Sequence, residues 1–483
     1  MAVFQNNLLA GAGAQSSDST HTINQSIRFN DDDSPALNKT YSGAGSQTTF
    51  TYSCWLKVAT TDTGSGFPLF NGGTGTSDTT WSGVAYYQGM IYSQGYSTNW
   101  RITSRKLRDP AAWYHIVYVW DTTNIIPDER IRIYVNGTRE TEFSTKNNPG
   151  ASANSGINQA AQHTIGYQSR TVGWGYADAY LAEMVFIDGQ ALEPSSFAET
   201  NENGIWVPKD VSGLTFGTNG FHIDGRDSSD LGDDESGRGN DYTATGLSAH
   251  DQVSDSPTNN FAVINPLYVD STGINSITLA NGNLQATGTS GQFDHKATTV
   301  NLPSSGKWYF EYYLGGLYTG FGACIVGQEG SISSGYGFGN LSTSQGFGFQ
   351  NDSIYNGSAV TTAFGLGNRS AGDILNVAVD VDNDKFYLGI NNTYVAADGG
   401  ADGNPSSGSN PTVTTSFSLS TNDIILGFYL SSSSGSVYLN FGQEGTFAGN
   451  KTAGGNSDAN GIGNFLYSVP TGFKALCTKN LGS

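Results

Sequence analysis

Two carboxylates in one predicted strand are the residues whose type and spacing come nearest to hydrolytic chemistry. Glu183 and Asp188 both lie in the segment Tyr180-Leu-Ala-Glu-Met-Val-Phe-Ile-Asp-Gly-Gln190. A glycosidase needs two carboxyl groups that converge on one glycosidic bond as nucleophile or base and as acid. This segment lacks the Glu-x-Asp-x-x-Glu spacing that would place such a pair on one strand face. We therefore expect Glu183 to face solvent, Asp188-Gly189 to form a hairpin turn, and the protein not to be an enzyme.

The histidines and cysteines give no support for nucleophilic or zinc-dependent chemistry. No two of the six histidines have the spacing of a metal pair, and no Gly-x-Ser-x-Gly motif accompanies them. The three cysteines are far apart, odd in number and without a Cys-x-x-Cys pair, so we expect small core residues and no disulfide framework. The residues concerned are His21, His115, His163, His222, His250, His295, Cys54, Cys324 and Cys477.

Acidic clusters raise the question of calcium. Asp380-Val-Asp-Asn-Asp384 begins like an EF-hand loop, but Lys385 stands where the turn glycine belongs and Asn391 replaces the bidentate glutamate. We expect a hairpin turn there and no bound cofactor. Calcium at the acidic turns is the alternative to solvated turns, and the oxygen ligands would come from Asp31, Asp32, Asp33, Asp227, Asp230, Asp233 and Asp234.

Aromatic residues in Gly/Ser-rich stretches are the strongest functional candidates. Flat aromatic rings stack on the apolar C–H faces of sugars, and neighbouring Asn, Gln and Ser side chains can hydrogen-bond the hydroxyls. The alternative is that alternate residues of Val84-Ala-Tyr-Tyr-Gln88 and Met90-Ile-Tyr92 belong to an ordinary core. The candidates in the first half of the chain are Trp81, Tyr86, Tyr87, Tyr92, Tyr96, Trp100, Trp174 and Tyr176.

Comparable loop positions in the second half of the chain hold Tyr318, Tyr336, Phe338, Tyr355 and Asn356. These residues suit a protein partner as well as a glycan, and the sequence does not separate the two.

Composition excludes several classes of partner. The formal net charge is −20, with 22 Lys and Arg against 42 Asp and Glu. No basic patch is present that could neutralise nucleic-acid phosphates, and the same charge opposes docking on anionic membranes. The N-terminal segment lacks a basic region followed by a long apolar region, and no apolar run has membrane-spanning length. We expect no nucleic-acid binding, no membrane insertion, no signal peptide and folding in a cytoplasm.

Short strands and tight turns must position these residues. Tyr and Phe number 25 each among 64 glycines, which predicts an all-β protein. Strands are expected at 49–57, 113–121, 130–139 and 180–190, with a hairpin at Asn136-Gly137 and one short helix at 192–199. We predict an N-terminal arm or anchor over 1–20, with a disordered tail as the alternative. A sandwich is expected over 21–200, a connector with a small strand pair over 201–266, and a second sandwich over 267–483.

Two strand patterns resemble known sandwich families. The segments Gly306-Lys-Trp-Tyr-Phe-Glu-Tyr-Tyr313 and 371–388, with the closing strand Val437-Tyr-Leu-Asn-Phe-Gly442, resemble a SPRY (B30.2-like) domain. Ser26-Ile-Arg-Phe-Asn30, Tyr52-Ser-Cys-Trp-Leu-Lys57 and Ile133-Tyr-Val-Asn-Gly137 resemble a concanavalin A-like (laminin G-like) jelly roll. These resemblances imply two antiparallel β-sandwiches that bind through their loops and faces.

The chain as a whole resembles virion structural proteins of marine tailed bacteriophages. The resemblance rests on the opening Met1-Ala-Val-Phe-Gln-Asn-Asn-Leu-Leu9, on 25–33 and on the ending Gly472-Phe-Lys-Ala-Leu-Cys477. It implies a structural protein of the virion, and we expect a tail fibre, appendage or decoration subunit that binds host surface glycans or neighbouring virion subunits. A homo-oligomer such as a trimer fits a fibre, although no heptads are present. The alternatives are a polysaccharide depolymerase and a purely architectural component.

Overall fold

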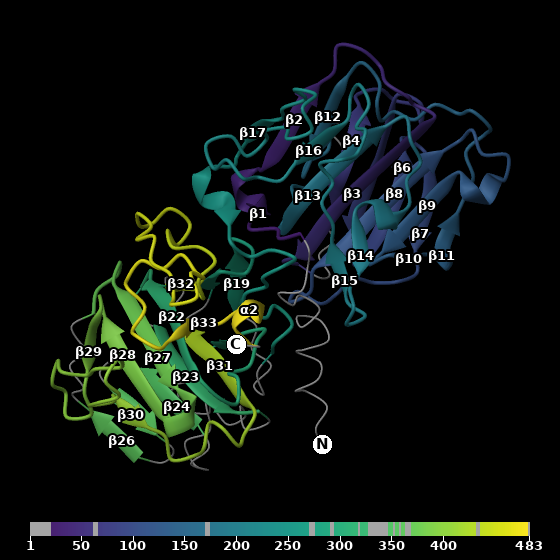
Figure 1. The fold of residues 1–483 in the computed structure, drawn as a ribbon. Coiled ribbons are helices and arrows are strands. Elements are labelled where there is room, and N and C mark those ends of the chain that lie inside the picture. The colour runs from purple at the N-terminus through teal and green to yellow at the C-terminus, as the bar shows by residue number, and fades with distance from the viewer. Residues whose placement is uncertain are drawn as a thin grey trace. The chain divides into compact units, whose positions relative to one another are not determined.

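The computed structural model divides into two compact units between Asn260 and Phe261, called here the first and the second sandwich. It describes residues 21–60, 66–169, 174–269, 276–289, 294–316, 319–326, 346–350, 353–356, 359–362, 369–430 and 435–481. The expected arm at 1–20 lies outside the described residues. Strands dominate both units (Figure 1), which confirms the all-β prediction.

The first sandwich consists of two eight-stranded antiparallel sheets, A and B. Sheet A has the order β10-β9-β8-β3-β13-β1-β18, with β16 also paired to β13. Its strands are β1 (Ser26–Phe29), β3 (Thr49–Val58), β8 (Tyr114–Asp121), β9 (Ile131–Val135), β10 (Thr138–Arg139), β13 (Ala179–Asp188), β16 (Phe221–Ile223) and β18 (Gln252–Val253).

Sheet B has the order β11-β7-β6-β5-β4-β12-β2-β17. Its strands are β2 (Ala36–Thr40), β4 (Phe67–Gly73), β5 (Trp81–Tyr87), β6 (Met90–Gly95), β7 (Asn99–Thr103), β11 (Phe143–Lys146), β12 (Gln162–Ile165) and β17 (Thr243–Thr245). Outside the two sheets lie the strand pair β14 (Ala198–Thr200) and β15 (Trp206–Pro208), and the 3-10 turns η1 (Asp31–Asp33), η2 (Pro127–Glu129), η3 (Pro194–Ser196) and η4 (Ala249–Asp251).

Alternation along the strands builds the core between the two sheets. On β3 the residues Phe50, Tyr52 and Cys54 face inward and meet Phe70 and Val84 of sheet B. The outer face of sheet A is covered as well, because Val117 and Val119 of β8 pack against residues of the segment 191–216. The strand expected at 113–121 is therefore confirmed, and it is buried on both faces.

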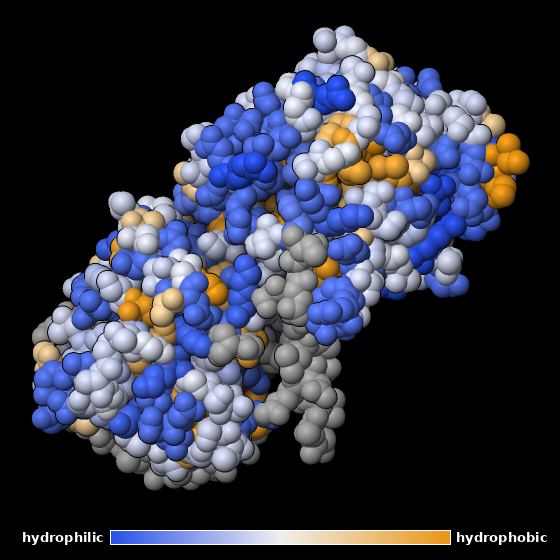
Figure 2. All heavy atoms as spheres, viewed as in Figure 1, coloured by the Kyte–Doolittle hydropathy of each residue, from blue (hydrophilic) through white to orange (hydrophobic). Residues whose placement is uncertain are grey.

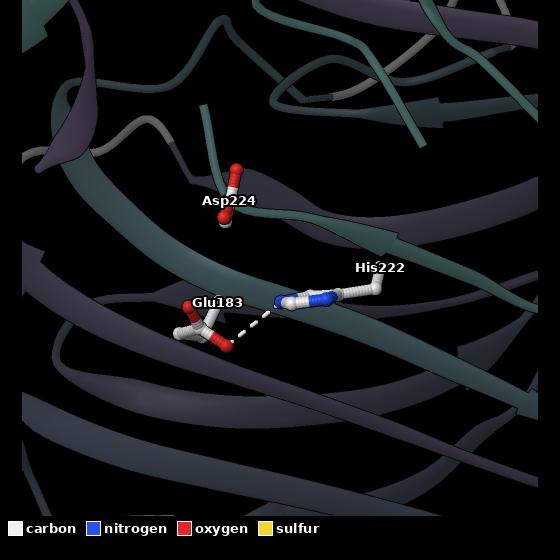
Figure 3. A group of neighbouring side chains, drawn as sticks. All are labelled: Glu183, His222 and Asp224. Atoms are coloured by element: carbon white, nitrogen blue, oxygen red, sulfur yellow. Dashed lines mark hydrogen bonds and ion pairs between the residues drawn. The ribbon is translucent and has the colours of Figure 1, made fainter. Parts of the chain in front are cut away.

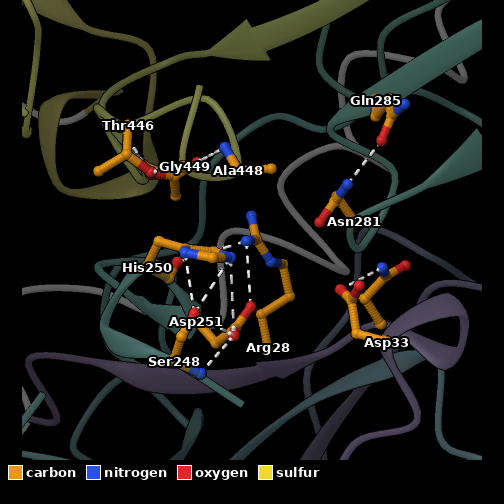
Figure 4. Close-up of polar contacts among 12 residues, drawn as sticks. Arg28, Asp33, Ser248, His250, Asp251, Asn281, Gln285, Thr446, Ala448 and Gly449 are labelled. Carbon is orange, nitrogen blue, oxygen red and sulfur yellow. Dashed lines mark hydrogen bonds and ion pairs between the residues drawn. The ribbon is translucent and has the colours of Figure 1, made fainter. Parts of the chain in front are cut away.

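Most of the segment expected as a connector, 201–260, contributes instead to the first sandwich, and 261–266 belongs to the second. Its strands β16, β17 and β18 pair with β13, β2 and β1. A small strand pair forms between β15 and β14, but β14 lies before the segment in which the pair was expected. Buried charge pairs anchor this segment. The Lys57 ammonium donates to Asp255 at 2.6 Å, and the Arg28 guanidinium donates to Asp251 at 3.1 Å. Figure 4 shows Arg28, Ser248 and His250 gathered around Asp251.

The short helix predicted at 192–199 is wrong. Only the single 3-10 turn η3 forms there, and the chain continues directly into β14. Pro194 suits the first turn of a helix, but no side chain caps its N-terminus. The next residues, Phe197 and Ala198, are buried in different apolar clusters on the outer side of sheet A. Packing against the sheet therefore overrides the weak helical signal.

The second sandwich contains a nine-stranded sheet, C, and a six-stranded sheet, D. Sheet C is formed by β19 (Ile277–Ala280), β20 (Gln285–Gly288), β22 (Lys307–Leu314), β27 (Ile374–Asp380), β28 (Lys385–Ile390), β29 (Thr393–Val395), β30 (Val413–Thr414), β32 (Ser436–Asn440) and β33 (Lys474–Ala475). Sheet D is formed by β21 (Asp294–Ala297), β23 (Thr319–Ile325), β24 (Gly346–Gln350), β25 (Ser353–Asn356), β26 (Ala359–Thr362) and β31 (Ile424–Leu430). The turn η5 (Val381–Asn383) and the helical turn α2 (Thr478–Leu481) complete the unit.

A carboxylate buried in sheet C fixes the segment after β32. Glu311 of β22 is fully buried and accepts hydrogen bonds from the backbone N–H groups of Leu466 and Tyr467, both at 2.9 Å. The Tyr309 hydroxyl donates to the same carboxylate at 2.8 Å. Burial raises the pKa of Glu311, and these donors oppose the increase. The aromatic strand singled out in the sequence therefore has a structural role.

The visible surface of each sandwich is mostly hydrophilic, with small apolar patches (Figure 2). Within the described ranges, the structure contains no helix that is long and apolar enough to cross a membrane.

Candidate functional site

The predicted aromatic residues of β5 divide between the two faces of sheet B. Trp81 and Tyr86 are buried, with 2% and 3% of their surface exposed. The Tyr86 hydroxyl donates to the carbonyl of Leu107 at 3.0 Å. Both side chains are therefore almost inaccessible to a ligand, and their burial does not support their prediction as ligand-binding residues. Neighbouring residues of a strand point to opposite faces, so Tyr87 lies on the outer face.

Tyr87, Tyr92 and Trp174 form one half-buried aromatic group, which we call the aromatic platform. Tyr92 of β6 pairs with Ala85, two residues from Tyr87, and thus shares its outer face. The ring centroids lie 5.6 Å apart for Tyr87 and Tyr92, 5.1 Å for Tyr87 and Trp174, and 5.7 Å for Tyr92 and Trp174. All three pairs meet edge to face. The structure thus brings together three of the predicted residues from β5, β6 and a distant loop.

Backbone hydrogen bonds and one glycine position Trp174. The Trp174 N–H donates to the side-chain oxygen of Gln168 at 3.2 Å, and the Gly175 N–H donates to the carbonyl of Gly66 at 2.8 Å. A Cβ atom on Gly66 would lie 2.2 Å from the Trp174 ring. Gly66 is therefore required for the indole to lie against the backbone before β4.

Asn71 of β4 fastens the loop that carries Trp174. Its amide donates to the carbonyl of Tyr167 at 2.8 Å, and its oxygen accepts from the hydroxyl of Ser169 at 2.7 Å. Tyr167 stacks on the predicted residue Tyr176, with 4.2 Å between centroids and 15° between planes. Tyr167 is not among the residues predicted from the sequence, although Tyr167 stands at the start of the same Gly/Ser-rich loop. Both tyrosines are half-buried.

Trp100 does not join the platform. It is half-buried, packs against the interior of the first sandwich and meets Trp120 edge to face at 6.2 Å. Its prediction as a ligand-binding residue is not supported by this position. Tyr96, in the turn after β6, is 41% exposed.

The candidates of the second sandwich stay predictions. Tyr318 and Tyr336 lie outside the described residues, as does Phe338. Tyr355 and Asn356 belong to β25, which pairs with β24 and β26, and their side chains lie outside the description.

The acidic turns use their oxygens for local hydrogen bonds. At 380–384 the turn η5 joins β27 and β28, and Asp380 accepts from Asn383 at 3.0 Å. The hairpin expected there is confirmed. Asp33 accepts from Asn30, and Asp227 accepts from Ser229. Asp234 is buried and accepts the N–H groups of His222 and Asn240.

Asp188 ends β13 and organises three loops. One of its oxygens accepts from the Ser46 N–H at 2.8 Å and from the Asn158 amide at 2.6 Å. The other accepts from the N–H groups of Thr218 and Asn219. The carboxylate is thus saturated by donors within the fold.

Glu183 is buried, with 7% of its surface exposed, so the expectation that it faces solvent is wrong. Its carboxylate lies 2.8 Å from His222 Nε2, and its second oxygen lies 3.9 Å from His21 Nε2. Asp224 completes a buried group whose ligand atoms lie within 4.8 Å of one another (Figure 3). Burial opposes ionisation of Glu183, but the two histidines outweigh it and lower the pKa. Burial likewise lowers the pKa of His222, and Glu183 reverses this to a net increase.

A bulge in β13 explains the placement of Glu183. Ala182 pairs with Trp55 and Val185 with Ser53, so Glu183 and Met184 together oppose one residue of β3. Glu183 has a φ of +47°. Leu181, Met184 and Phe186 all face the core, and a regular strand would have turned residue 183 inward as well. The bulge removes the carboxylate from the core and turns it towards β16.

Comparisons with known proteins support the fold of the first sandwich. Residues 29–196 match a laminin G-type family model described as the concanavalin A-like lectin/glucanases superfamily. This match confirms the expected concanavalin A-like domain in that part of the chain. No curated protein matches the chain in sequence.

Several solved structures are similar to parts of the chain. The SPRY domain of human HERC1 is 14% identical, with 36% of this chain and 96% of that chain covered and a TM-score of 0.23. A protein of Bacteroides ovatus described as a candidate carbohydrate-binding protein is 16% identical, with coverages of 47% and 58% and a TM-score of 0.31. A SAP-like pentraxin from Limulus polyphemus is 18% identical, with coverages of 36% and 80% and a TM-score of 0.26. These identities are too low to transfer a function.

Proposed function

We propose that the chain is a non-enzymatic carbohydrate-binding protein that acts as a structural subunit of a tailed-phage virion. The observation that carries the binding proposal is the aromatic platform of Tyr87, Tyr92 and Trp174. It lies on the outer face of sheet B, within the segment that matches the concanavalin A-like lectin/glucanases model.

The chemistry of the platform suits a sugar. Half-buried rings offer apolar surface for the C–H face of a pyranose, and the phenol hydroxyls offer donors and acceptors for its hydroxyl groups. Gln88 donates to the Tyr87 hydroxyl at 3.2 Å, which orients one of these groups. Tyr167 and Tyr176, carried by the same loop as Trp174, form a second, half-buried aromatic pair that could stack on a further sugar.

The same residues argue for binding without hydrolysis. A glycosidase would place two carboxyl groups on either side of the scissile bond. The platform, the Tyr167–Tyr176 pair and Gln88 supply only aromatic and amide side chains. Asp188 is held by backbone and amide donors, and Glu183 lies in sheet A rather than sheet B.

The virion role rests on the resemblance of 1–9, 25–33 and 472–477 to phage structural proteins. In this proposal other virion proteins and further copies of the chain are the protein partners, with a trimer as the expected oligomer. The glycan belongs to the surface of the host. Immunogold labelling of particles would locate the protein, and labelling of host cell material alone would contradict the virion role.

A glycan array probed with the full chain tests carbohydrate binding. We expect saturable binding to a subset of bacterial surface glycans, strongly reduced by Trp174→Ala and retained by Tyr96→Ala as the exposed aromatic control. Absence of saturable binding would instead favour a purely architectural role. Release of reducing sugar from a bound polysaccharide would contradict the non-enzymatic proposal and favour a depolymerase.

A further inference from the structure

Glu183, His222 and Asp224 form a buried group on the outer side of sheet A that has no part in the proposed carbohydrate binding. Glu183 comes from the bulge of β13, and His222 and Asp224 come from β16 and the residue after it. His222 pairs with Val185, which places it beside the bulge. All three residues are at least nine-tenths buried. They are held by paired strands rather than by a mobile loop, which favours a preorganised arrangement.

We infer that Glu183, His222 and Asp224 bind one zinc-class divalent metal ion. Zinc in proteins takes nitrogen and oxygen ligands at 2.0–2.2 Å in a tetrahedron, so its ligand atoms lie ~3.4 Å apart. The Glu183 and His222 atoms are 2.8 Å apart, and all three ligand atoms lie within 4.8 Å of one another. Small side-chain rotations therefore suffice to enclose an ion, and the fourth position is left for water or a further ligand.

The chemical types of the three ligands favour one class of metal ion. One imidazole with two carboxylates suits zinc and its neighbours in the first transition row, whereas calcium and magnesium prefer oxygen ligands alone. The acidic turns at 31–33 and 227–234 offer carboxylates without an imidazole, which are the ligands expected for calcium. The imidazole of His222 thus distinguishes the inferred zinc-class site from the calcium alternative at these turns.

Neighbouring residues hold the ligands in place. Arg226 donates to Asp224, with Nε at 2.7 Å, and thereby balances one of the two buried carboxylates. Phe216 lies parallel to the His222 ring at 6.4 Å between centroids. His21 Nε2 lies 3.9 Å from Oε1 of Glu183, whereas His222 contacts the other oxygen, Oε2. We assign His21 as a positioning residue, because outer partners of this kind orient ligands and contribute 10–100-fold to metal affinity.

The strained backbone at residue 183 supports the assignment. A glutamate with positive φ is less stable than one in the right-handed region, and glycine would remove that cost. Such strain often accompanies sites that need one fixed side-chain direction. Here the glutamate supplies the carboxylate between His21 and His222.

Metal titration of the chelator-treated full chain tests the inference. We expect one zinc ion per chain by calorimetry, a visible absorption band with Co²⁺ in the same stoichiometry, and no comparable binding of Ca²⁺. His222→Ala should weaken zinc at least ~100-fold, and Glu183→Gln should do the same while keeping a hydrogen-bonding group at the bulge. His21→Ala should weaken zinc ~10-fold and shift the cobalt band.

His250→Gln is the matched control, because it removes a half-exposed histidine outside the group. It should leave zinc affinity and stoichiometry unchanged. Unfolding curves of the metal-free variants establish that they fold. If His222→Ala fails to fold, Glu183→Gln still tests the inference. Zinc binding that is equal in wild type and Glu183→Gln, or the absence of a stoichiometric site, would overturn the inference and leave a purely structural ion pair.

Discussion

Two charge pairs of the first sandwich and one carboxylate of the second bury negative charge in different ways. In the first sandwich, Asp255 and Asp251 face cationic groups from distant parts of the chain, in the pairs Lys57–Asp255 and Arg28–Asp251. In the second, Glu311 lies among neutral donors, including two backbone N–H groups of one short segment. A charge held by another charge depends on both partners, whereas a charge held by several dipoles loses less when one contact changes.

Glu311 and Glu183 differ in the same way: the contacts of Glu311 only stabilise the fold, whereas Glu183 can replace its present partners with a ligand. The Glu311 carboxylate is enclosed by donors that belong to the backbone and to neighbouring strands. Glu183 is paired instead with titratable histidines on the outer face of sheet A, at a bulge. The first sandwich therefore combines a rigid core with two groups able to accept a ligand, the aromatic platform on sheet B and the Glu183 group on sheet A.

The largest expected effect is on the charge pair that joins β3 to the segment after β18. Asp255→Ala leaves the Lys57 ammonium buried without its carboxylate and removes the acceptor of the Trp113 indole N–H. Breaking a buried pair in this way costs about 3–5 kcal/mol. Hydrogen exchange of the full chain should speed up in β1, β3 and β18 and stay unchanged in β22 and β27. Equal acceleration in both sandwiches would contradict independent stabilisation by this pair.

Acid should weaken the first sandwich through two buried neutral histidines. Trp206 donates to Nδ1 of His115, and the Asn158 N–H donates to Nε2 of His163, so each ring has one nitrogen fixed as an acceptor. Burial lowers the pKa of His115 to about 3 and the pKa of His163 to about 4. Below pH 6.5 the unfolded chain binds protons that the folded chain does not, so stability is lost as pH falls.

By linkage the two histidines together cost about 3 kcal/mol at pH 5.5. Hydrogen exchange, corrected for its intrinsic pH dependence, should show this loss in β8 and β12. The variant His163→Gln should reduce the acid sensitivity of β12. An acid sensitivity of β12 that is the same in the wild type and in His163→Gln would contradict the assigned neutral state of His163.

A smaller effect is expected for the carboxylate of the second sandwich. Glu311→Gln keeps the side-chain shape but replaces one acceptor oxygen with an amide that faces backbone N–H groups. The cost should be about 2 kcal/mol. The loss should appear as faster exchange at 464–467 and in β22, with the first sandwich as internal control. A loss as large as that of Asp255→Ala would erase the proposed difference between the two kinds of burial.

Local patterns in the sequence predicted most strands. The alternation at 49–57 and the Asn136-Gly137 turn correspond to β3 and to the hairpin of β9 and β10, with φ of 49° and 75° at the turn. The pairing of 201–260 with the first sandwich could not be predicted, because short strands such as β16 and β18 carry too few residues for a periodic signal. Long-range charge pairs determine where they lie.

The candidate sites were only partly predictable. Alternation requires that Tyr86 and Tyr87 face opposite sides, but only the packing decides which one faces the core. Trp174 and Tyr167 reach sheet B through a loop whose path depends on Asn71 and Gly66. The Glu183 group depends on a bulge, in which two residues of β13 lie opposite one residue of β3. This arrangement follows from the register of the two strands and has no signal in the sequence of either strand alone.

Direct titration of the platform tests the central claim. For the glycan bound most tightly by the full chain, calorimetry should show about 10-fold or greater loss of affinity for Tyr92→Ala and for Trp174→Ala, which corresponds to ~1.4 kcal/mol of lost stacking. Trp100→Phe and Tyr96→Ala should bind as the wild type does, because Trp100 packs beside Trp120 against the interior and Tyr96 lies in the turn after β6. Unchanged affinity in both platform variants, with their folds intact, would contradict carbohydrate binding on the outer face of sheet B.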